Sequence, residues 1–508
     1  MPTPILLDGL HLTRRDFYAI ALEGRRVGLS RRARIAMRKS RALVEKLIAD
    51  KQVVYGVTTG VGSLSTERIA PAQARALQLN VVRSHACGVG EPLGVAETRG
   101  LLLLRANTLA RGLSGVRPAI AERLCAFLNH GIHPLVPRRG SVGASGDLAP
   151  LAHVALALVG EGEVFFRDQR QPAATVMKSL HLNPLVLEAK EGLSLVNGTQ
   201  AMLSVGLLAL RDAEILADTA DVSGALSLDA LRGSTRAFDP RLHAARPHPG
   251  QIESARRLAQ MIRGSAINKS HQGCARVQDA YSLRCMPQVH GTVRDALGYA
   301  RQTFETEMNS VTDNPLVYAR EREVISGGNF HGQPLALALD LAAMALTQLG
   351  AIAERRVDRL VNPLTSELPA FLTRSAGLES GLMLAQVTAA ALASENKVLA
   401  HPASVDSIPT SGNKEDFVSM GMTAALKLQS VVTNVRTILA IELLTACQAL
   451  DLLAPLKSGV LAERARAIVR RVSPAVTSDR PLHADIARLS ELVRKGALAG
   501  IPGLALSS

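Results

Sequence analysis

The chain has 508 residues and is 47% apolar but only 3% aromatic, without tryptophan. Its 58 lysines and arginines outnumber its 44 acidic residues, which gives a formal net charge of +14 at pH 7. These basic residues are scattered and no run of aromatic side chains accompanies them, so the composition argues against a nucleic-acid partner. The five cysteines form no CxxC pair, which argues against both a disulfide framework and a zinc site.

The N-terminal residues MPTPILLDGLHLTRRD show no long apolar segment of the kind that directs secretion. The most membrane-like run, PLALALDLAAMALTQLGAIA from Pro334, is interrupted by Asp340 and followed by ERRVDR. We therefore expect a buried helix there rather than one that spans a membrane. Together these features predict a cytoplasmic protein with no membrane partner.

Alanine and leucine dominate the composition and strand-like alternation is rare, which predicts a mostly α protein. From about Asp16 to Asp50 helical periodicity alternates with basic turns, and the first glycine cluster, VVYGVTTGVGSLS, follows. A second glycine-rich stretch, RRGSVGASGDLAPLAH, begins at Arg138 and places Asp147 at the N-cap position of a helix that reaches about Gly160. Beyond it, EGEVFFRDQRQPAA is expected to form a hairpin or a loop.

Helical signals become long in the second half of the chain. They begin with AMLSVGLLALRDAEILADTADVSGALSLDAL and continue from Pro334 to about Arg359, from Leu378 to Ala400 and from Lys414 to Leu453. Helices of this length bury their apolar stripes against neighbours, so they predict a bundle. The expected organisation is a glycine-punctuated N-terminal region, residues 1–195, followed by a long-helix bundle, residues 196–508.

The order Ala144-Ser145-Gly146 distinguishes three interpretations of the second glycine-rich stretch: a helix-capping turn, a serine hydrolase nucleophile and a cyclised electrophile. A turn that caps a helix explains the glycines but not this order, and a serine hydrolase would show G-x-S-x-G around its nucleophile. Attack of the Gly146 nitrogen on the Ala144 carbonyl would instead close a five-membered ring. Loss of water from that ring and from Ser145 would leave an exocyclic methylidene, a strong electrophile made without metal or added cofactor.

The segment GSVGASGDLAPLAH resembles the signature of the aromatic amino acid ammonia-lyases, which share the 4-methylidene-imidazol-5-one (MIO) group. Further segments resemble family motifs and follow the family order across nearly the whole chain: YGVTTGVG, RSHACGVG, EGLSLVNGTQ, QDAYSLRCMPQVHG, NSVTDNPLV, SGGNFHG and SIPTSGNKEDFVSM. The resemblance implies a mostly α long-helix bundle of the fumarase/aspartase-like lyase type, in which the N-terminal region carries the MIO loop. It also implies a homotetramer whose active sites are each built from three subunits.

Such a lyase removes ammonia together with a scarcely acidic β proton, so it needs an electrophile, a strong base, a carboxylate clamp and a ring pocket. The resemblance implies that MIO forms from Ala144, Ser145 and Gly146. A guanidinium pairs naturally with a carboxylate, and the resemblance makes Arg284 the clamp. The other implied residues are Tyr55 as the base, Tyr281 beside the electrophile, Asn197 and Gln278 as polar supports, Phe330 as pocket lining, and Gly62 and Asn314 as supporting positions. The resemblance implies no metal.

Two positions bear on the ring of a small-molecule aromatic amino acid substrate. His85 follows Ser84, a pairing of histidine ammonia-lyases and of some tyrosine lyases and tyrosine aminomutases. Glu415 stands at the position of the glutamate in the NQEDH segment that is typical of histidine lyases. Phenylalanine lyases and many tyrosine lyases have glutamine at this position. A carboxylate holds an N–H-donating imidazole and matches a bare phenyl ring poorly. The chain is thus most similar to the histidine ammonia-lyases, and the expected reaction converts L-histidine to trans-urocanate and ammonia.

Four residues depart from the family motifs. Thr58 replaces an asparagine and Val61 a common phenylalanine, while Lys414 stands for glutamine and Phe417 for histidine. Phe417 makes the pocket edge more apolar. Lys414 is placed to pair with Glu415, which would weaken the hold of that carboxylate on an imidazole.

These departures leave alternatives open. A tyrosine ammonia-lyase or a tyrosine 2,3-aminomutase that uses the same electrophile is the near alternative. A non-catalytic helical scaffold is the distant one, and the intact Tyr55, Ser145 and Arg284 argue against it.

Overall fold

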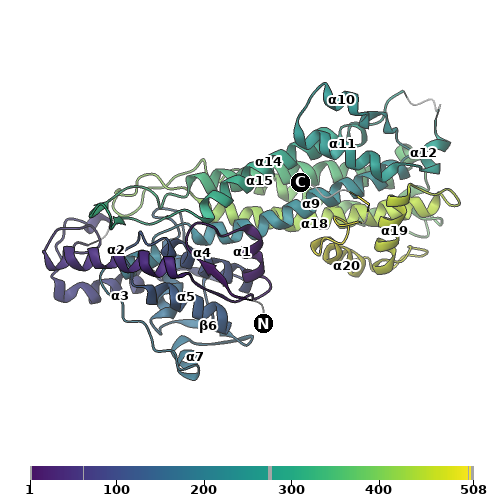
Figure 1. Ribbon diagram of the computed structural model, residues 1–508. Coiled ribbons are helices and arrows are strands. Elements are labelled where there is room, and N and C mark those ends of the chain that lie inside the picture. Colours follow the sequence, from purple (N-terminus) through teal and green to yellow (C-terminus); the bar gives the residue numbers. More distant parts are fainter. Residues whose placement is uncertain (1–2, 61, 273–276, 502, 505–508) are drawn as a thin grey trace. The chain divides into compact units, whose positions relative to one another are not determined.

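The computed structural model describes residues 3–60, 62–272, 277–501 and 503–504 and is drawn as a ribbon in Figure 1. The chain forms two compact units. The first unit comprises Met1–Leu208, Arg301–Leu339 and Pro402–Leu426, and the second comprises Ala209–Ala300, Asp340–His401 and Lys427–Ser508. This division differs from a single break after residue 195, because the chain returns to the first unit twice after leaving it.

The first unit is built mainly from helices. Its helices are α1 (Arg14–Ala21), α2 (Arg31–Ala49), α3 (Ala74–His85), α4 (Val95–Ala110), α5 (Pro118–His130), α6 (Leu148–Leu158), α7 (Ala173–Ser179) and α8 (Glu191–Val196), with short 3-10 helices at Gly62–Leu64 and Pro71–Gln73. Helix α4 packs against α1 and α5, and every residue from Glu97 to Ala110 is buried. It is therefore a central helix of this unit.

Small sheets flank these helices. Their strands are β1 (Ile5–Leu7), β2 (Val27–Leu29), β3 (Val89–Pro92), β4 (His133–Pro134), β5 (Pro137–Arg139), β6 (Glu163–Phe166), β7 (Gln169–Pro172), β8 (Leu316–Tyr318) and β9 (Glu323–Ile325). Strands β1 and β2 pair in parallel, whereas β3–β5, β4–β6–β7 and β8–β9 pair antiparallel. The hairpin expected from EGEVFFRDQRQPAA is β6–β7, so that prediction is confirmed.

Long helices dominate the rest of the chain. They are α9 (Gln200–Ala230), α14 (Met286–Met308), α15 (Gln333–Val361), α17 (Met383–Leu399) and α18 (Gly421–Leu452). Shorter helices are α10 (Pro240–Ala244), α11 (Pro249–Ile262), α12 (Ala266–Ser270), α13 (Tyr281–Arg284), α16 (Pro363–Ser366), α19 (Val460–Val472) and α20 (His483–Arg494), with 3-10 turns at Thr235–Phe238 and Ala370–Leu372. The predicted mostly α fold is confirmed.

Two helix starts were predicted too early. The helix expected from about Leu378 begins at Met383. Helix α18 begins at Gly421 and not near Lys414. Lys414 lies in a closed turn whose ends, Thr410 and Glu415, pair with each other. Asn413 in this turn and Met420 directly before α18 adopt left-handed backbone angles, with φ of 63° and 56°. Left-handed angles interrupt a helix, and the apolar periodicity did not reveal them.

Among the described residues, α15 and α18 are long and apolar enough to cross a membrane, with mean hydropathy of 1.8 and 1.4 over their most apolar windows. However, 61% and 72% of these windows are buried inside the protein. Burial to this extent is typical of core helices in a bundle, which is how the sequence was interpreted.

A buried ionic network links the long helices of the second unit. The Glu442 carboxylate on α18 accepts hydrogen bonds from Ser223 and Ser227 of α9, at 2.7 Å each, and from Arg356 Nη2 of α15, at 3.0 Å. On α14, His290 Nδ1 lies 2.8 Å from an Asp221 carboxylate oxygen of α9. Buried charges of this kind persist only when partners satisfy them, so the network fixes the relative placement of these helices within the unit.

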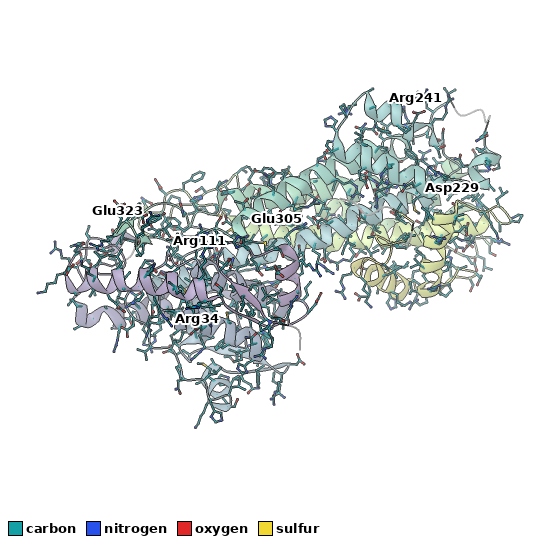
Figure 2. All side chains as sticks on the ribbon, viewed as in Figure 1. Arg34, Arg111, Asp229, Arg241, Glu305 and Glu323 are labelled. Carbon is teal, nitrogen blue, oxygen red and sulfur yellow. The ribbon has the colours of Figure 1, made fainter. Side chains whose placement is uncertain are left out.

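Asp221 is the carboxylate on which Arg257, His290 and Arg294 converge. Burial by itself raises the pKa of a carboxyl group, but Arg294 at 2.6 Å, together with His290 and Arg257, holds the pKa of Asp221 well below its ordinary value. Asp229, labelled in Figure 2 near the end of α9, is different: burial raises its pKa, and it accepts hydrogen bonds from Ser265 and Ser458 instead of from a cation.

The network predicts the effect of removing one buried cation. Arg356→Met should lower the free energy of unfolding by about 3–5 kcal/mol, because it leaves Glu442 as a buried charge without its cation. Urea titration followed by circular dichroism measures this loss. Arg494, whose side chain is 49% exposed and pairs with the 43% exposed side chain of Glu491, provides the control, and Arg494→Met should hardly change stability. Equal losses in the two variants would contradict the role given to the network.

Candidate functional site

The Ala144-Ser145-Gly146 segment forms a tight turn immediately before α6. Gly143 and Gly146 pair with each other across it and have left-handed φ of 76° and 75°. Ala144 is buried against Val418 and Met420, which belong to the segment that precedes α18. The chain therefore already reverses direction over Ala144 and Ser145, as the cyclisation expected from the sequence requires.

A close approach of two glycine backbones holds this turn. The Asp147 amide donates to the Gly198 carbonyl oxygen at 2.7 Å, and the Gly198 amide donates to the Ser145 carbonyl oxygen at 3.3 Å. A Cβ atom on Gly146 would collide with the carbonyl oxygen of Gly198. Only glycine fits at residue 146, because of both its φ and this contact.

Asp147 has a role other than the one predicted from its position. It does occupy the N-cap of α6, but its side chain makes no capping hydrogen bond. Instead its carboxylate accepts from Ser141 Oγ at 2.9 Å and from the Met202 amide in the first turns of α9 at 2.8 Å. Burial raises the pKa of Asp147 to about 6. The side chain thus ties the turn to α9, because the tertiary fold supplies donors that compete with the helix's own amides.

Glu415 lies beside the turn. Its Oε1 accepts a hydrogen bond from Ser145 Oγ at 3.2 Å, and its Oε2 accepts one from Thr410 Oγ1 at 2.8 Å. The closed turn from Thr410 to Glu415 also pairs through its backbone, with Thr410 N donating to Glu415 O at 2.9 Å. Lys414 is exposed, and the described contacts include no ion pair between it and Glu415. The expected weakening of Glu415 by Lys414 is therefore not seen.

Tyr55 and Gly62 belong to one small loop. The Gly62 amide donates to Tyr55 Oη at 2.9 Å. A Cβ on Gly62 would lie 2.7 Å from Ser411 Oγ, so this loop runs close to the turn that carries Glu415. Thr58 replaces the family asparagine and accepts from the Val54 amide at 2.9 Å, which closes the loop locally. Val61, the other departure here, lies outside the described residues.

Asn197 and Asn314 are in direct contact. Asn197 Nδ2 donates to the Asn314 carbonyl oxygen at 3.1 Å, while Asn197 Oδ1 is buried and has no protein partner within the described part of the chain. Asn314 Oδ1 in turn accepts from the Gly327 amide at 2.8 Å, at the start of SGGNFHG. The free acceptor of Asn197 is therefore available to a donor on a bound molecule.

Three further candidates for the ring pocket, Phe330, Phe417 and His85, also belong to the first unit. Phe330 is half-buried in SGGNFHG, and the next residue, His331, has its Nε2 3.1 Å from the Phe417 carbonyl oxygen and its ring stacked on that of Phe417. His85 ends α3, with Nδ1 3.1 Å from Ser84 Oγ, and α3 packs against α6 and α8. Phe417, which replaces the family histidine, is thus paired with another aromatic ring.

The remaining candidates belong to the second unit. Gln278 precedes α13, and Tyr281 and Arg284 are its first and last residues. Tyr281 is 71% exposed, and the Arg284 guanidinium lies 4.7 Å from the centre of its ring. Arg284 Nε is buried without a protein partner among the described residues. Gln278, Tyr281 and Arg284 thus belong to the second unit. One region of the first unit brings together the other contacting candidates: Ser145, Glu415, Asn197, Asn314, Tyr55 and Gly62.

Comparison with known proteins assigns the family. The family model for aromatic amino acid lyases matches residues 12–471. The chain belongs to this family. It is 57% identical to the histidine ammonia-lyase of Koribacter versatilis over 97% of this chain and 98% of that protein. The crystal structure of histidine ammonia-lyase from Trypanosoma cruzi is 43% identical and has a TM-score of 0.90, covering 98% of this chain and 94% of that one.

A second solved structure is similarly close in fold. The tyrosine aminomutase of Streptomyces globisporus is 38% identical with a TM-score of 0.94, and it covers 99% of this chain and 100% of that one. Chains named as lyases and as aminomutases thus share the fold of this aromatic amino acid lyase. The fold alone does not separate these two named activities.

Two residues that contact the candidate site of this lyase were not among those predicted from the sequence. Thr410 Oγ1 donates a hydrogen bond to Glu415 Oε2, and Arg105 of α4 donates to the carbonyl oxygen of Asn197 at 2.9 Å. Thr410 lies in the motif SIPTSGNKEDFVSM but gave no signal of its own. Arg105 did give a sequence signal, because a charged residue inside the apolar segment LLLLRANTLA must find hydrogen-bond partners in the core.

The glycine contact predicts a difference between two substitutions. Gly131 and Gly146 have similar left-handed φ, 68° and 75°, but a Cβ at Gly131 would meet nothing within 4 Å. Gly131→Ala should cost about 1 kcal/mol of unfolding free energy from backbone strain. Gly146→Ala should cost about 1–3 kcal/mol more from the collision. Urea unfolding of both variants measures the difference, and equal costs would contradict the close approach.

Proposed function

We propose that this chain is a MIO-dependent ammonia-lyase that eliminates ammonia from L-histidine to give trans-urocanate. The observation that carries the proposal is the position of Glu415, whose carboxylate lies 3.2 Å from the Ser145 hydroxyl of the turn. A carboxylate beside the reacting group suits a substrate ring that donates an N–H. The identity to proteins named histidine ammonia-lyase supports the same substrate.

The residues present fit formation of the MIO group. Ala144 and Ser145 form the reversal between paired Gly143 and Gly146, so the chain is bent where the ring would close. Once formed, the group would supply an electrophile for the substrate's amino group. The acceptor Oδ1 of Asn197, which has no partner among the described residues, lies next to Gly198, which contacts the turn, and it would accept a hydrogen bond from a donor on the substrate.

The other candidate residues would each have a separate role in the elimination. Tyr55 would remove the β proton, and the Gly62 amide that donates to its Oη stabilises negative charge at that oxygen. Arg284 would bind the substrate carboxylate as a bidentate partner, and its unpartnered Nε leaves a donor for that purpose. Tyr281 and Gln278 would stand beside the electrophile, and His85 and Phe330 would line the ring pocket.

The proposal includes a homotetramer with shared active sites. It rests on the family resemblance and on the 71% exposure of Tyr281, a residue that the site requires. An exposed functional residue is accounted for when another subunit covers it. The cytoplasmic location stays a prediction.

A product assay tests the reaction. Purified protein is offered L-histidine, L-tyrosine and L-phenylalanine separately, with ultraviolet absorbance reporting unsaturated acids and mass spectrometry reporting β-amino acids. We expect urocanate from histidine. Glu415→Gln should reduce turnover of histidine about 100-fold or more, because the imidazole loses its charged partner, and Ser145→Ala should abolish it.

The assay also separates the alternatives. Coumarate or β-tyrosine as the main product would overturn the substrate assignment and favour a tyrosine lyase or aminomutase. Full activity of Ser145→Ala would overturn the MIO proposal itself.

Co-expression of two inactive variants tests the shared site. Chains carrying Tyr55→Phe and chains carrying Tyr281→Phe should each be inactive alone. In mixed tetramers about a quarter of the sites should contain both intact tyrosines, if these come from different subunits. Recovery of about that share of the wild-type rate is expected, whereas no recovery would contradict sharing of these residues. Sedimentation velocity should give a tetramer in both cases.

A further inference from the structure

A buried cluster of charged residues lies beneath the segment that contacts the Ser145 turn. It consists of Arg105 on α4, Lys190 just before α8, and Asp313, all three almost completely buried. Lys190 Nζ donates to Ser194 Oγ at 2.8 Å and lies 3.3 Å from Asp313 Oδ2. We call these three residues the buried cluster.

Arg105 is bonded to neutral acceptors. Its guanidinium donates to the Asn197 carbonyl oxygen at 2.9 Å, to Gln200 Oε1 at 3.0 Å and to the Ser194 carbonyl oxygen. Burial lowers the pKa of Arg105 to about 10, so it remains a cation at neutral pH. The backbone acceptors belong to the last turn of α8 and the residue after it, where carbonyl groups lack helical partners and the helix dipole is negative.

The cluster holds two cations and one carboxylate. A buried arginine that relies on neutral carbonyls is a costly arrangement. Within this lyase the second unit shows the cheaper alternative, in which Arg294 and Arg356 each have a carboxylate at bonding distance. The position of Arg105 therefore calls for a reason other than general stability.

The geometry around Asn197 supplies that reason. The carbonyl that Arg105 holds and the Gly198 amide belong to one planar peptide unit. That same Gly198 amide donates to the Ser145 carbonyl oxygen at 3.3 Å. The Ser145 carbonyl in turn shares a rigid peptide unit with the Gly146 nitrogen, which is the nucleophile of the cyclisation.

We propose that Arg105 is a positioning residue for formation of the electrophile: it fixes the Asn197–Gly198 peptide, which fixes the Ser145–Gly146 peptide. This inference rests on the proposed MIO chemistry. In that chemistry the Gly146 nitrogen bonds to the Ala144 carbonyl carbon. The Ala144 oxygen then leaves in water with the amide protons of Gly146 and Ser145, and a double bond forms between the Ala144 carbon and the Ser145 nitrogen. The Ser145 hydroxyl and the proton on its Cα leave as another water, with no net oxidation or reduction.

The test compares two buried arginines of the same helix. Arg99, also on α4, is buried and donates to the backbone carbonyl oxygens of Ile20 and Leu128, away from the turn. Arg99→Met and Arg105→Met each remove a buried guanidinium that serves backbone carbonyls. The content of the group is measured in the folded fraction of each preparation, as mass lost by dehydration of the intact chain and as the ultraviolet absorbance of the methylidene.

Arg105→Met should reduce the fraction of folded chains that carry the group by about ten-fold or more. Arg99→Met should leave that fraction at the wild-type value even where it lowers the thermal unfolding midpoint. Arg105→Lys keeps the charge but loses the fork of donors, so it should give an intermediate content. It also provides the decisive comparison if Arg105→Met does not fold.

Three outcomes would overturn the inference. The first is a wild-type content of the group in folded Arg105→Met, and the second is an equal loss in Arg99→Met and Arg105→Met. The third is a full content in Arg105→Lys when Arg105→Met does not fold. A wild-type chain that carries no group at all would refute the proposed function itself, and the wild-type sample therefore separates the two failures.

Discussion

The site depends on the close approach of the Gly146 and Gly198 backbones. Two glycines from distant motifs meet where neither tolerates a side chain, and the hydrogen bonds between Gly198 and its neighbours at Ser145 and Asp147 fix the turn. Because the peptide unit is rigid, this contact transmits the placement of Asn197 directly to Ser145. The Ser145 hydroxyl group is then held in a defined position, where it donates a hydrogen bond to Glu415.

Buried guanidinium groups in this lyase are satisfied in two different ways. In the second unit, carboxylates on α9 and α18 meet guanidinium groups from α11, α14 and α15, so charge is balanced within the helical packing. In the first unit, Arg105 is bonded to carbonyl oxygens and to a glutamine. The first arrangement stabilises a bundle, whereas the second fixes a particular stretch of backbone at a cost in desolvation.

The departures from the family motifs are accommodated locally. Thr58 closes its own loop through the Val54 amide, and Phe417 stacks on His331. Glu415 keeps two hydrogen-bond donors, Thr410 and Ser145, and Lys414 stays in solvent. The Glu415 carboxylate is therefore held independently of the residues that changed around it.

The sequence by itself determined the helical class, the long helices, the β6–β7 hairpin and the motifs that carry the candidate site, because periodicity, turn residues and motif order are local properties. It did not determine where α18 begins, what Asp147 bonds to, or that Arg105 holds Asn197. Those features depend on donors and acceptors supplied by distant segments, such as the Met202 amide for Asp147. Only the tertiary structure brings such groups within hydrogen-bonding distance, and burial then makes each pairing obligatory.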